Sequence, residues 1–230
     1  TMVDENTLSL ILREPIGVVG QIVPWNFPFL MAAWKLAPVL AAGDVTILKP
    51  SSSTSLSVLE LMKLIQNVVP KGVINLITGK GSKSGEFLQH NTGLDKLAFT
   101  GSTEVGREIG LSAAQMIIPS TLELGGKSAN VFFKDADMKV ALEGIQLGIL
   151  FNQGQVCSAG SRIFVEESFY DEFMAHVIPA FQKVKVGNPL DMNTQMGAQV
   201  DERQLKKILS YVEIGKQEGA KVAVGGARYT

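Results

Sequence analysis

Short apolar runs alternate with longer amphipathic stretches along the first half of the chain. Three short, mainly apolar runs predict buried strands, at residues 45–48, 73–77 and 97–99. Between and after them, apolar positions at helical spacing predict helices over residues 30–42 and 57–69 and from Thr103 onward. Buried strands that alternate with amphipathic helices predict an α/β fold with a doubly wound parallel sheet.

Turn and cap residues set the expected ends of several elements. Ser57 and Glu60 have the spacing of a capping box, which predicts that a helix opens at Ser57. Near the start, residues 8–12 and 16–23 are strand-like, and we expect two short strands with a bend at Pro15, compatible with an ordinary edge hairpin.

The second half continues the alternation with one strand and one helix at a time. We expect strands at 129–133 and 162–166, helices at 138–150, 168–184 and 201–218, and a further strand just before the end of the chain. One face of the helix from residue 168 is apolar and predicts core, through Phe169, Phe173, Val177 and Phe181. The last helix should turn a similar face inward, made of Leu205, Ile208, Leu209 and Val212.

Composition and charge exclude several classes of protein. The chain has 230 residues, 46% of them hydrophobic, with a formal net charge of −1 and a pI near 6.1, which gives no general attraction to nucleic acid or an anionic membrane. The apolar stretch 29–42 contains Lys35 and Pro38 and is shorter than the ~20 residues of a membrane span. With one cysteine and no signal peptide, we expect a cytoplasmic protein.

The single cysteine, Cys157, lies in the stretch FNQGQVCSAG, directly after the predicted helix 138–150. A lone thiol forms no internal disulfide, so Cys157 is either a small buried hydrophobic residue or a nucleophile. Gln153, Gly154 and Gln155 are polar or flexible, which predicts a turn whose backbone N–H groups can stabilise a thiolate and a developing oxyanion.

Two further residues are candidate partners for this thiol. Glu123, in LELGG, is a carboxylate between leucines, and apolar surroundings favour a pKa suited to a general base. Asn26, in PWNFP, could donate its side-chain amide to a negative oxygen. Taken singly, each residue is equally compatible with an ordinary loop glutamate or a turn asparagine.

Polar and glycine-rich segments follow the predicted strands. Lys49 follows the first, GKGSKSG with Gly81 and Gly85 follows the second, and TGST with Ser102 follows the third. Ligands of doubly wound sheets bind at the carboxyl ends of the strands, and a helix N-terminus binds phosphate. The spacing of the first glycine loop is not that of the usual dinucleotide motif. His90 and His176 lack metal-ligand spacing, so no metal site is expected.

Five segments, PWNFP, KPS, FTGSTEVG, LELGGKSAN and FNQGQVCSAGSR, occur in an order and spacing that resemble the aldehyde dehydrogenase superfamily. The resemblance covers essentially the whole chain and implies a Rossmann-like cofactor domain plus part of a second α/β catalytic domain. It implies a β-ribbon with oligomerisation strands at 1–24, the dinucleotide-binding domain at 25–124 and a partial catalytic domain at 125–230. Because family members are longer at both ends, we expect a truncated chain or fragment of a homo-oligomer.

The resemblance also implies a set of cofactor-binding residues: Trp25, Lys49, Ser52, Gly81, Gly85, Gly101, Ser102, Gly106, Leu124 and Gln204. The cofactor would be NAD or NADP. Family members that prefer NAD commonly carry an acidic residue where this chain has Ser52. A neutral hydroxyl does not repel a 2′-phosphate, so NADP or dual use is expected alongside NAD.

The function implied is oxidation of a small-molecule aldehyde to a carboxylic acid. Cys157 would attack the carbonyl, Asn26 and the Cys157 backbone N–H would hold the oxyanion, and Glu123 would activate the water that hydrolyses the thioester. Three alternatives stay open: a CoA-acylating dehydrogenase, a catalytically silent fragment, and a stand-alone nucleotide-binding module.

Overall fold

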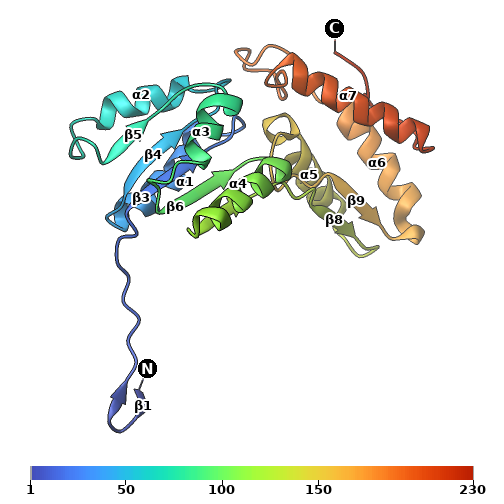
Figure 1. Ribbon diagram of the computed structural model, residues 1–230. Helices are drawn as coiled ribbons and strands as arrows, with labels where there is room; N and C mark the ends of the chain where they lie inside the picture. The colour runs from blue at the N-terminus through green and yellow to red at the C-terminus, as the bar shows by residue number, and fades with distance from the viewer. Residues whose placement is uncertain (1, 230) are drawn as a thin grey trace. The chain divides into compact units, whose positions relative to one another are not determined.

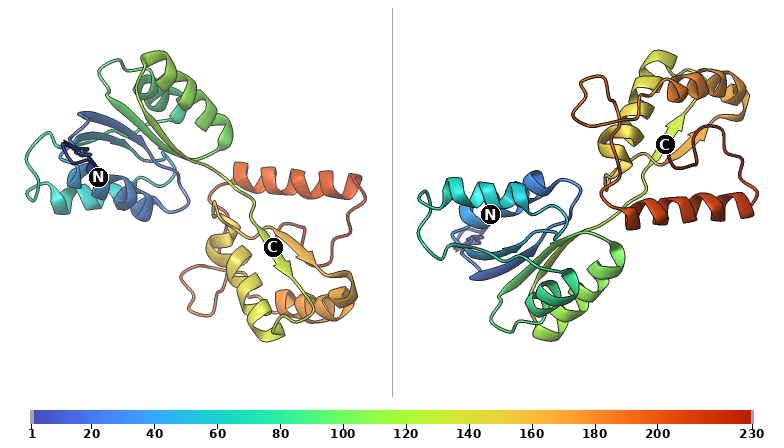
Figure 2. Two further views of the ribbon diagram at one scale, coloured as in Figure 1. Left: turned by 90° about the horizontal axis from the view of Figure 1, so that it is seen from below. Right: turned by 90° about the horizontal axis from the view of Figure 1, so that it is seen from above.

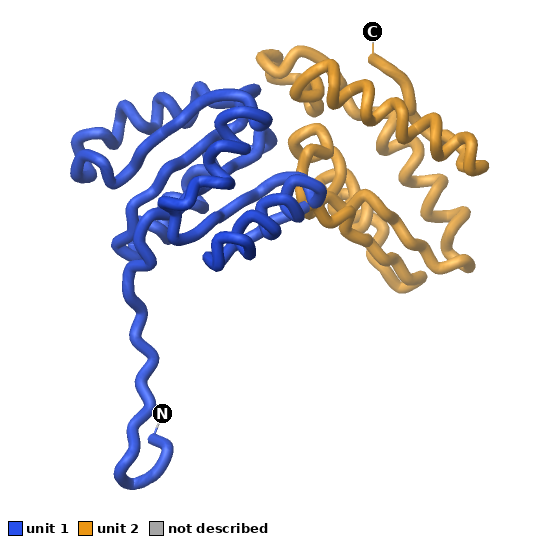
Figure 3. Tube along the Cα trace, in the orientation of Figure 1, with its two compact units in different colours: residues 1–124 blue, residues 125–230 orange. Residues whose placement is uncertain are grey.

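The computed structural model describes residues 2–229. The chain forms two compact units, residues 1–124 (unit 1) and residues 125–230 (unit 2), coloured separately in Figure 3. In the described part of the chain, no helix is both long enough and apolar enough to cross a bilayer.

Unit 1 is built on a parallel five-stranded sheet (Figure 1). Its strands are β3 (Val18–Ile22), β4 (Val45–Lys49), β5 (Ile74–Leu76), β6 (Lys96–Thr100) and β7 (Ser120–Glu123). Their order across the sheet is β5-β4-β3-β6-β7, and every neighbouring pair is parallel. The chain therefore builds outward from β3, first to one side and then to the other.

Helices cover both faces of this sheet, which confirms the predicted doubly wound α/β fold. They are α1 (Pro28–Ala41), α2 (Leu56–Ile65), α3 (Glu86–Gln89) and α4 (Thr103–Met116), with a π-helical turn η1 (Gly81–Gly85) before α3. Leu48 of β4 packs with α1 and α2, whereas Ile47 beside it packs against the cluster formed with α3 and α4. Figure 2 shows α1 and α2 on the side of the sheet opposite to α4.

The predicted N-terminal ribbon is wrong. The only pairing there is a short antiparallel hairpin between β1 (Met2–Asp4) and β2 (Thr7–Leu8), and residues 9–17 form no strand. The second half of the expected ribbon is instead β3, the central strand of the parallel sheet. The reason lies in its composition, because the nearly continuous apolar run of β3 suits a strand covered on both faces rather than an edge hairpin.

Two other boundaries in unit 1 differ from expectation. The helix α2 begins at Leu56, one residue before Ser57, so the expected capping box does not form and the Ser57 hydroxyl is buried without a hydrogen-bond partner. The strand β7 is absent from the sequence-based prediction, because only four residues separate Pro119 from Leu124 and three of them are polar. This omission matters for function, since β7 ends at Glu123.

Unit 2 has a two-stranded parallel sheet and a helical layer. The elements are β8 (Ala129–Phe132), α5 (Met138–Leu150), η2 (Phe151–Gly154), β9 (Arg162–Val165), η3 (Glu167–Phe169), α6 (Tyr170–Gln182) and α7 (Glu202–Gln217). The core joins α5 to α6 through Ile145, Phe169, Phe173 and Val177, with Phe181 half-buried beside them. The predicted aromatic face of this helix is confirmed.

The apolar face of α7 is less covered than predicted. None of its residues is buried, and Leu205, Ile208, Leu209 and Val212 line an open groove of about 710 Å³. The expected strand near the end does not form, because residues 220–229 pair with no other strand. An apolar segment forms a β-strand only where its backbone N–H and C=O groups can pair with a neighbouring strand.

Candidate functional site

The carboxyl edge of the parallel sheet gathers several residues predicted from the sequence. β3 leads into Asn26, β4 ends at Lys49, β6 is followed by Gly101, and β7 ends at Glu123. The Gly101 N–H donates to the Glu123 carbonyl at 3.0 Å, which ties two of these strand ends together. Strands β4 and β5 are added on one side of β3, and β6 and β7 on the other, so the strand order reverses between β3 and β6. Such switch points form the ligand-binding crevice of doubly wound sheets. Asn26 and Gly101 follow the two strands that flank this point.

The loop that carries Trp25 and Asn26 is held at both ends. It follows Val23, whose N–H donates to the Lys49 carbonyl at 3.1 Å, and it runs directly into α1, which begins at Pro28. Proline suits the first helical position because its φ angle is preset and it has no N–H to leave unpaired. Trp25 and Asn26 are half-buried. The loop is therefore anchored between β3 and α1.

Lys49 is a buried cation at the end of β4. Its side chain is 2% exposed, and its Nζ donates to the Pro50 carbonyl at 3.0 Å. Burial lowers the pKa of the Lys49 ammonium from its ordinary value. Gly85 lies over the aliphatic stem, because a Cβ at that position would be 3.5 Å from the Lys49 Cε. A buried ammonium beside a glycine turn is a feature of sites that accept anionic ligands.

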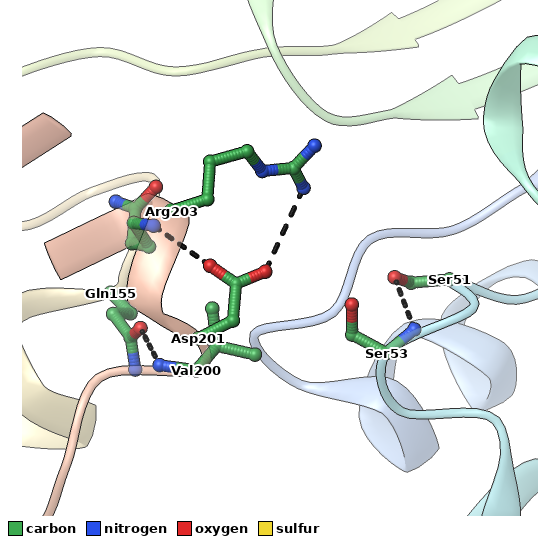
Figure 4. Close-up of polar contacts among 7 residues, drawn as sticks. Ser51, Ser53, Gln155, Val200, Asp201 and Arg203 are labelled. Carbon is green, nitrogen blue, oxygen red and sulfur yellow. Dashed lines mark hydrogen bonds and ion pairs between the residues drawn. The ribbon is translucent and has the colours of Figure 1, made fainter. Parts of the chain in front are cut away.

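Two other predicted cofactor residues, Ser52 and Gly81, are exposed. Ser52 is exposed within the turn that follows β4, where the Ser53 N–H donates to the Ser51 Oγ at 3.3 Å (Figure 4). Gly81 is exposed at the start of η1. Ser52 therefore presents a neutral hydroxyl to solvent.

Burial of Lys49 predicts a pH-dependent stability difference. Because its folded pKa lies below the ordinary 10.5, the unfolded state binds more protons between the two values. The cost of burying the ammonium is present in full below the folded pKa and fades as the pH rises toward 10.5. We expect the free energy of unfolding of the natural chain, relative to Lys49→Met, to increase from about pH 7 to about pH 10.

Urea denaturation of both proteins across this pH range measures the difference. Lys71→Met, which removes an exposed lysine of the same unit, should show a difference that stays level. A level difference for Lys49→Met as well would contradict the buried-ammonium interpretation.

The N-terminus of α4 presents the second predicted anion-binding element. Ser102 caps the helix, with its Oγ accepting from the Val105 N–H at 3.4 Å. The first N–H groups of an α-helix lie outside its internal hydrogen bonds and attract negative charge. Gly106 is buried against Leu124, and a Cβ at Gly106 would collide with the Leu124 side chain. These two residues therefore set how closely α4 packs on β7.

Glu123 shares a cavity with a residue that the sequence analysis did not select. A cavity of about 490 Å³ in unit 1 is lined by Glu123, Lys35, Gln21 and Trp34, among others. Lys35 is 9% exposed, and burial lowers its pKa while the charge of Glu123 opposes this change. Lys35 is the only charged residue between Pro28 and Ala42, and a lone lysine in an apolar helix is the signal that could have revealed it.

The nucleophile candidate is accessible. Cys157 is exposed, which excludes the reading as a buried hydrophobic residue. Its loop is fixed from both sides by backbone hydrogen bonds, since the Gly126 N–H donates to the Cys157 carbonyl at 3.1 Å and the Ser128 N–H to the Ala159 carbonyl at 3.1 Å. These bonds join the loop to the segment that enters β8. Only Leu124 and Gly125 separate Glu123 from Gly126.

The turn before Cys157 has an unusual backbone. Asn152, Gln153 and Gly154 all have positive φ angles, of 49°, 58° and 72°. Position 154 requires glycine for two reasons. Its φ angle is positive, and a Cβ there would lie 2.9 Å from the Ile149 carbonyl oxygen. For a residue with a side chain, the left-handed region costs roughly 1–2 kcal/mol. Such local strain is found at functional sites.

Gln204 lies in the first turn of α7 and is half-buried. Its N–H donates to Oδ1 of Asp201 at 2.7 Å, so it is part of the helix cap (Figure 4). The Asp201 carboxylate also pairs with Arg203 at 3.7 Å. Just before this cap, the Val200 N–H donates to Oε1 of Gln155 at 3.0 Å, which links the start of α7 to the nucleophile loop.

The structure thus groups the predicted residues by unit. Unit 1 brings the strand-end residues to one sheet edge, and unit 2 joins the Cys157 loop to the start of α7. Among residues 2–229, no three His, Cys, Asp or Glu side chains are arranged to hold a metal ion. The ring of His90 makes structural contacts, with its Nδ1 2.9 Å from the Glu86 carbonyl oxygen and its Nε2 3.2 Å from the Ser112 hydroxyl.

Comparison with known proteins gives consistent matches. The sequence profile described as "Aldehyde dehydrogenase family" matches residues 1–230. An aldehyde dehydrogenase of Vibrio cholerae serotype O1 is 53% identical over 229 residues, which are 97% of this chain and 45% of that protein.

Solved structures match at the same level. A betaine aldehyde dehydrogenase from Staphylococcus aureus in complex with NAD⁺ has a TM-score of 0.92 and 44% identity, covering 94% of this chain and 43% of that one. The NAD⁺ complex of an aldehyde dehydrogenase from Bacillus cereus has the same TM-score and identity, covering 94% and 44%. The chain spans less than half the length of these relatives.

Proposed function

Since the chain belongs to the aldehyde dehydrogenase family, we propose that it carries the nucleophile, the general base and the nucleotide-binding edge for oxidation of an aldehyde to a carboxylic acid with NAD or NADP. The catalytic residues of this proposal are Cys157, Asn26 and Glu123. Unit 1 is the dinucleotide-binding domain, and unit 2 is part of the catalytic domain.

One observation carries the proposal. The exposed Cys157 belongs to a loop whose carbonyl accepts a hydrogen bond from Gly126, and the chain reaches Gly126 three residues after Glu123. Three residues span at most about 11 Å. In this proposal the exposed Cys157 is the nucleophile and Glu123 is the base, although the two residues lie 34 positions apart in the sequence.

Each residue has a separate chemical task. The Cys157 thiolate attacks the aldehyde carbonyl carbon, forming a C–S bond and an oxyanion. The Asn26 amide and the Cys157 backbone N–H donate hydrogen bonds to that oxygen. Once the carbon has been oxidised to a thioester, Glu123 takes a proton from the water that attacks it, and the thiolate leaves.

The sheet edge suits a dinucleotide. The N-terminus of α4 and the buried Lys49 are positive features that fit a pyrophosphate, and Gly85 keeps the backbone close to the lysine stem. When bound, the oxidised nicotinamide supplies the acceptor for the hydride that leaves the substrate carbon. Because Ser52 is neutral, we expect NAD and NADP both to bind.

Aldehyde-dependent reduction of NAD⁺ and NADP⁺ by the chain tests this function. Betaine aldehyde, named for the Staphylococcus aureus relatives, is one suitable substrate probe, and a short aliphatic aldehyde is another. Added CoA should not be consumed, because Glu123 supports hydrolysis of the thioester rather than its transfer. Stabilisation of the chain by nucleotide without aldehyde-dependent reduction would mean that this segment binds nucleotide only.

Replacement of the base separates the two halves of the reaction. We expect Glu123→Gln to lower kcat about 10²–10⁴-fold, the usual contribution of a general base, while the first burst of reduced nicotinamide remains. Rapid-mixing absorbance measurements resolve the burst from the steady state. Glu108→Gln, an exposed glutamate of α4, is the matched control and should leave both phases unchanged. Loss of the burst with a normal steady state would refute this role for Glu123.

A further inference from the structure

The side-chain amide of Gln155 makes hydrogen bonds within the turn that precedes Cys157. Its Nε2 donates to the Asn152 carbonyl at 3.3 Å and to the Gln153 Oε1 at 3.2 Å. The Gln155 backbone N–H donates to the same Asn152 carbonyl at 3.0 Å. The Gln155 side-chain amide therefore contacts Asn152 and Gln153, the two residues of the turn that have a positive φ angle and are not glycine.

The other end of the same amide reaches a distant segment of unit 2. Its Oε1 accepts from the Val200 N–H at 3.0 Å, as Figure 4 shows. A second glutamine reinforces this link, because Gln199 Nε2 donates to the Gln153 carbonyl at 3.3 Å. The segment 199–200 is itself anchored, since Asp201 directly after it caps α7.

The turn needs such support. Asn152 and Gln153 adopt positive φ angles that residues with side chains rarely populate; Gly154 suits them intrinsically, and asparagine tolerates them better than glutamine does. Left-handed conformations persist where surrounding contacts impose them. Gln155 is the residue that supplies contacts on both sides of this turn, and it is separated from the thiol only by Val156.

We propose that Gln155 is a positioning residue, whose amide locks the left-handed turn at 152–154 and bridges it to Val200, and so fixes the loop that presents Cys157. The proposal rests on the function proposed for Cys157 as the nucleophile. Gln155 does not touch the reacting atoms in this assignment; it acts through the geometry of the loop.

Two substitutions separate the halves of the amide. Gln155→Glu keeps an acceptor for the Val200 N–H but sets a carboxylate against the Asn152 carbonyl and the Gln153 Oε1, so the turn loses its donor and gains repulsion. Gln155→Met keeps the length of the side chain and removes both functions. Gln182→Met, an exposed glutamine at the end of α6, is the matched control.

Hydrogen exchange of the backbone, read by mass spectrometry on peptides covering residues 151–160 and 196–204, tests the geometry in the 230-residue chain without requiring turnover. We expect both Gln155 variants to exchange faster in the peptide 151–160. Gln155→Met should also exchange faster in the peptide 196–204, where Gln155→Glu keeps the acceptor for the Val200 N–H, while the core peptide of α6 and the Gln182→Met protein stay unchanged. Unchanged exchange in both variants overturns the proposal, even if the chain proves to be an active dehydrogenase.

Kinetics supply the second readout. We expect kcat to fall about tenfold or more, with the KM for nucleotide within about twofold, because a misplaced nucleophile slows the chemical step rather than binding. The rate of alkylation of Cys157, the only cysteine, should stay measurable and confirm that the thiol is still exposed. An unchanged kcat in both variants overturns the positioning role. Full activity of a Cys157→Ala protein would instead refute the proposed function and leave the exchange result standing.

Discussion

Replacement of Cys157 by alanine is expected to abolish aldehyde oxidation completely. Because the chain contains one cysteine, no other thiol can take over the attack on the carbonyl, and without the C–S bond neither the oxyanion donors nor Glu123 has an intermediate to act on. Steady-state and burst phases should vanish together. This pattern differs from that of Glu123→Gln, which should keep the burst.

The same variant should keep its fold and its nucleotide site. Cys157 is exposed, so its truncation leaves no core cavity, and the sheet edge belongs to unit 1. We therefore expect nucleotide to raise the melting temperature of Cys157→Ala as much as that of the natural chain. Ser158→Ala, a change of the exposed neighbouring residue, is the control and should retain turnover. Any aldehyde-dependent reduction by Cys157→Ala above the protein-free rate removes Cys157 from the mechanism.

Phe173→Ala is expected to give the largest loss of stability, about 3–5 kcal/mol. Phe173 is 1% exposed at the centre of unit 2, with ring centroids 5.1 Å from Phe132 and 5.8 Å from Phe169. Its removal leaves a cavity between β8 and α6 and deletes both aromatic contacts. Chemical denaturation followed by far-UV circular dichroism measures the effect.

The chain offers a fluorescence signal that is specific to unit 1 and a control variant for this measurement. Trp25 and Trp34, the only tryptophans, both belong to unit 1, so tryptophan fluorescence follows that unit separately. Phe164→Ala removes a phenylalanine that is 51% exposed beside Arg162 and should cost about 1 kcal/mol or less. Equal losses for the two variants would show that Phe173 is not the centre of the core.

Local signals predicted the elements that carry their own boundaries. The helix α5 lies where the sequence places it, because Asp137 caps it with its Oδ1 on the Val140 N–H and the apolar run ends at the polar Asn152 turn. The strand β4 is a continuous apolar run that ends in a lysine, and it too was predicted. Residues 10–12 have equally strand-like side chains, but they lie exposed and outside any strand. Strand formation depends on a neighbour, which a local pattern does not contain.

The residues of the candidate site were likewise predictable where the signal is local and not where it depends on a distant part of the chain. Motif residues such as Cys157, Glu123 and Lys49 stand out in the sequence because their chemistry contrasts with their surroundings. Lys35 was missed because its importance comes from sharing a cavity with Glu123, which lies 88 positions later. The left-handed angles at Asn152 and Gln153 were also not predicted, since asparagine adopts a positive φ only occasionally and glutamine rarely does.

The strand order of unit 1 has a consequence for how the unit acquires its structure. Every strand pair in the sheet is parallel, so no pair can form as a local hairpin, and Val19 of the central strand lies opposite Lys96 of β6. The entropy of closing such long loops must be overcome before the pairing stabilises the chain, which slows folding compared with proteins rich in local contacts. The connection from β3 to β4 contains α1 alone, whereas β3 and β6 are separated by α1, β4, α2, β5, η1 and α3, so their pairing closes the longer loop.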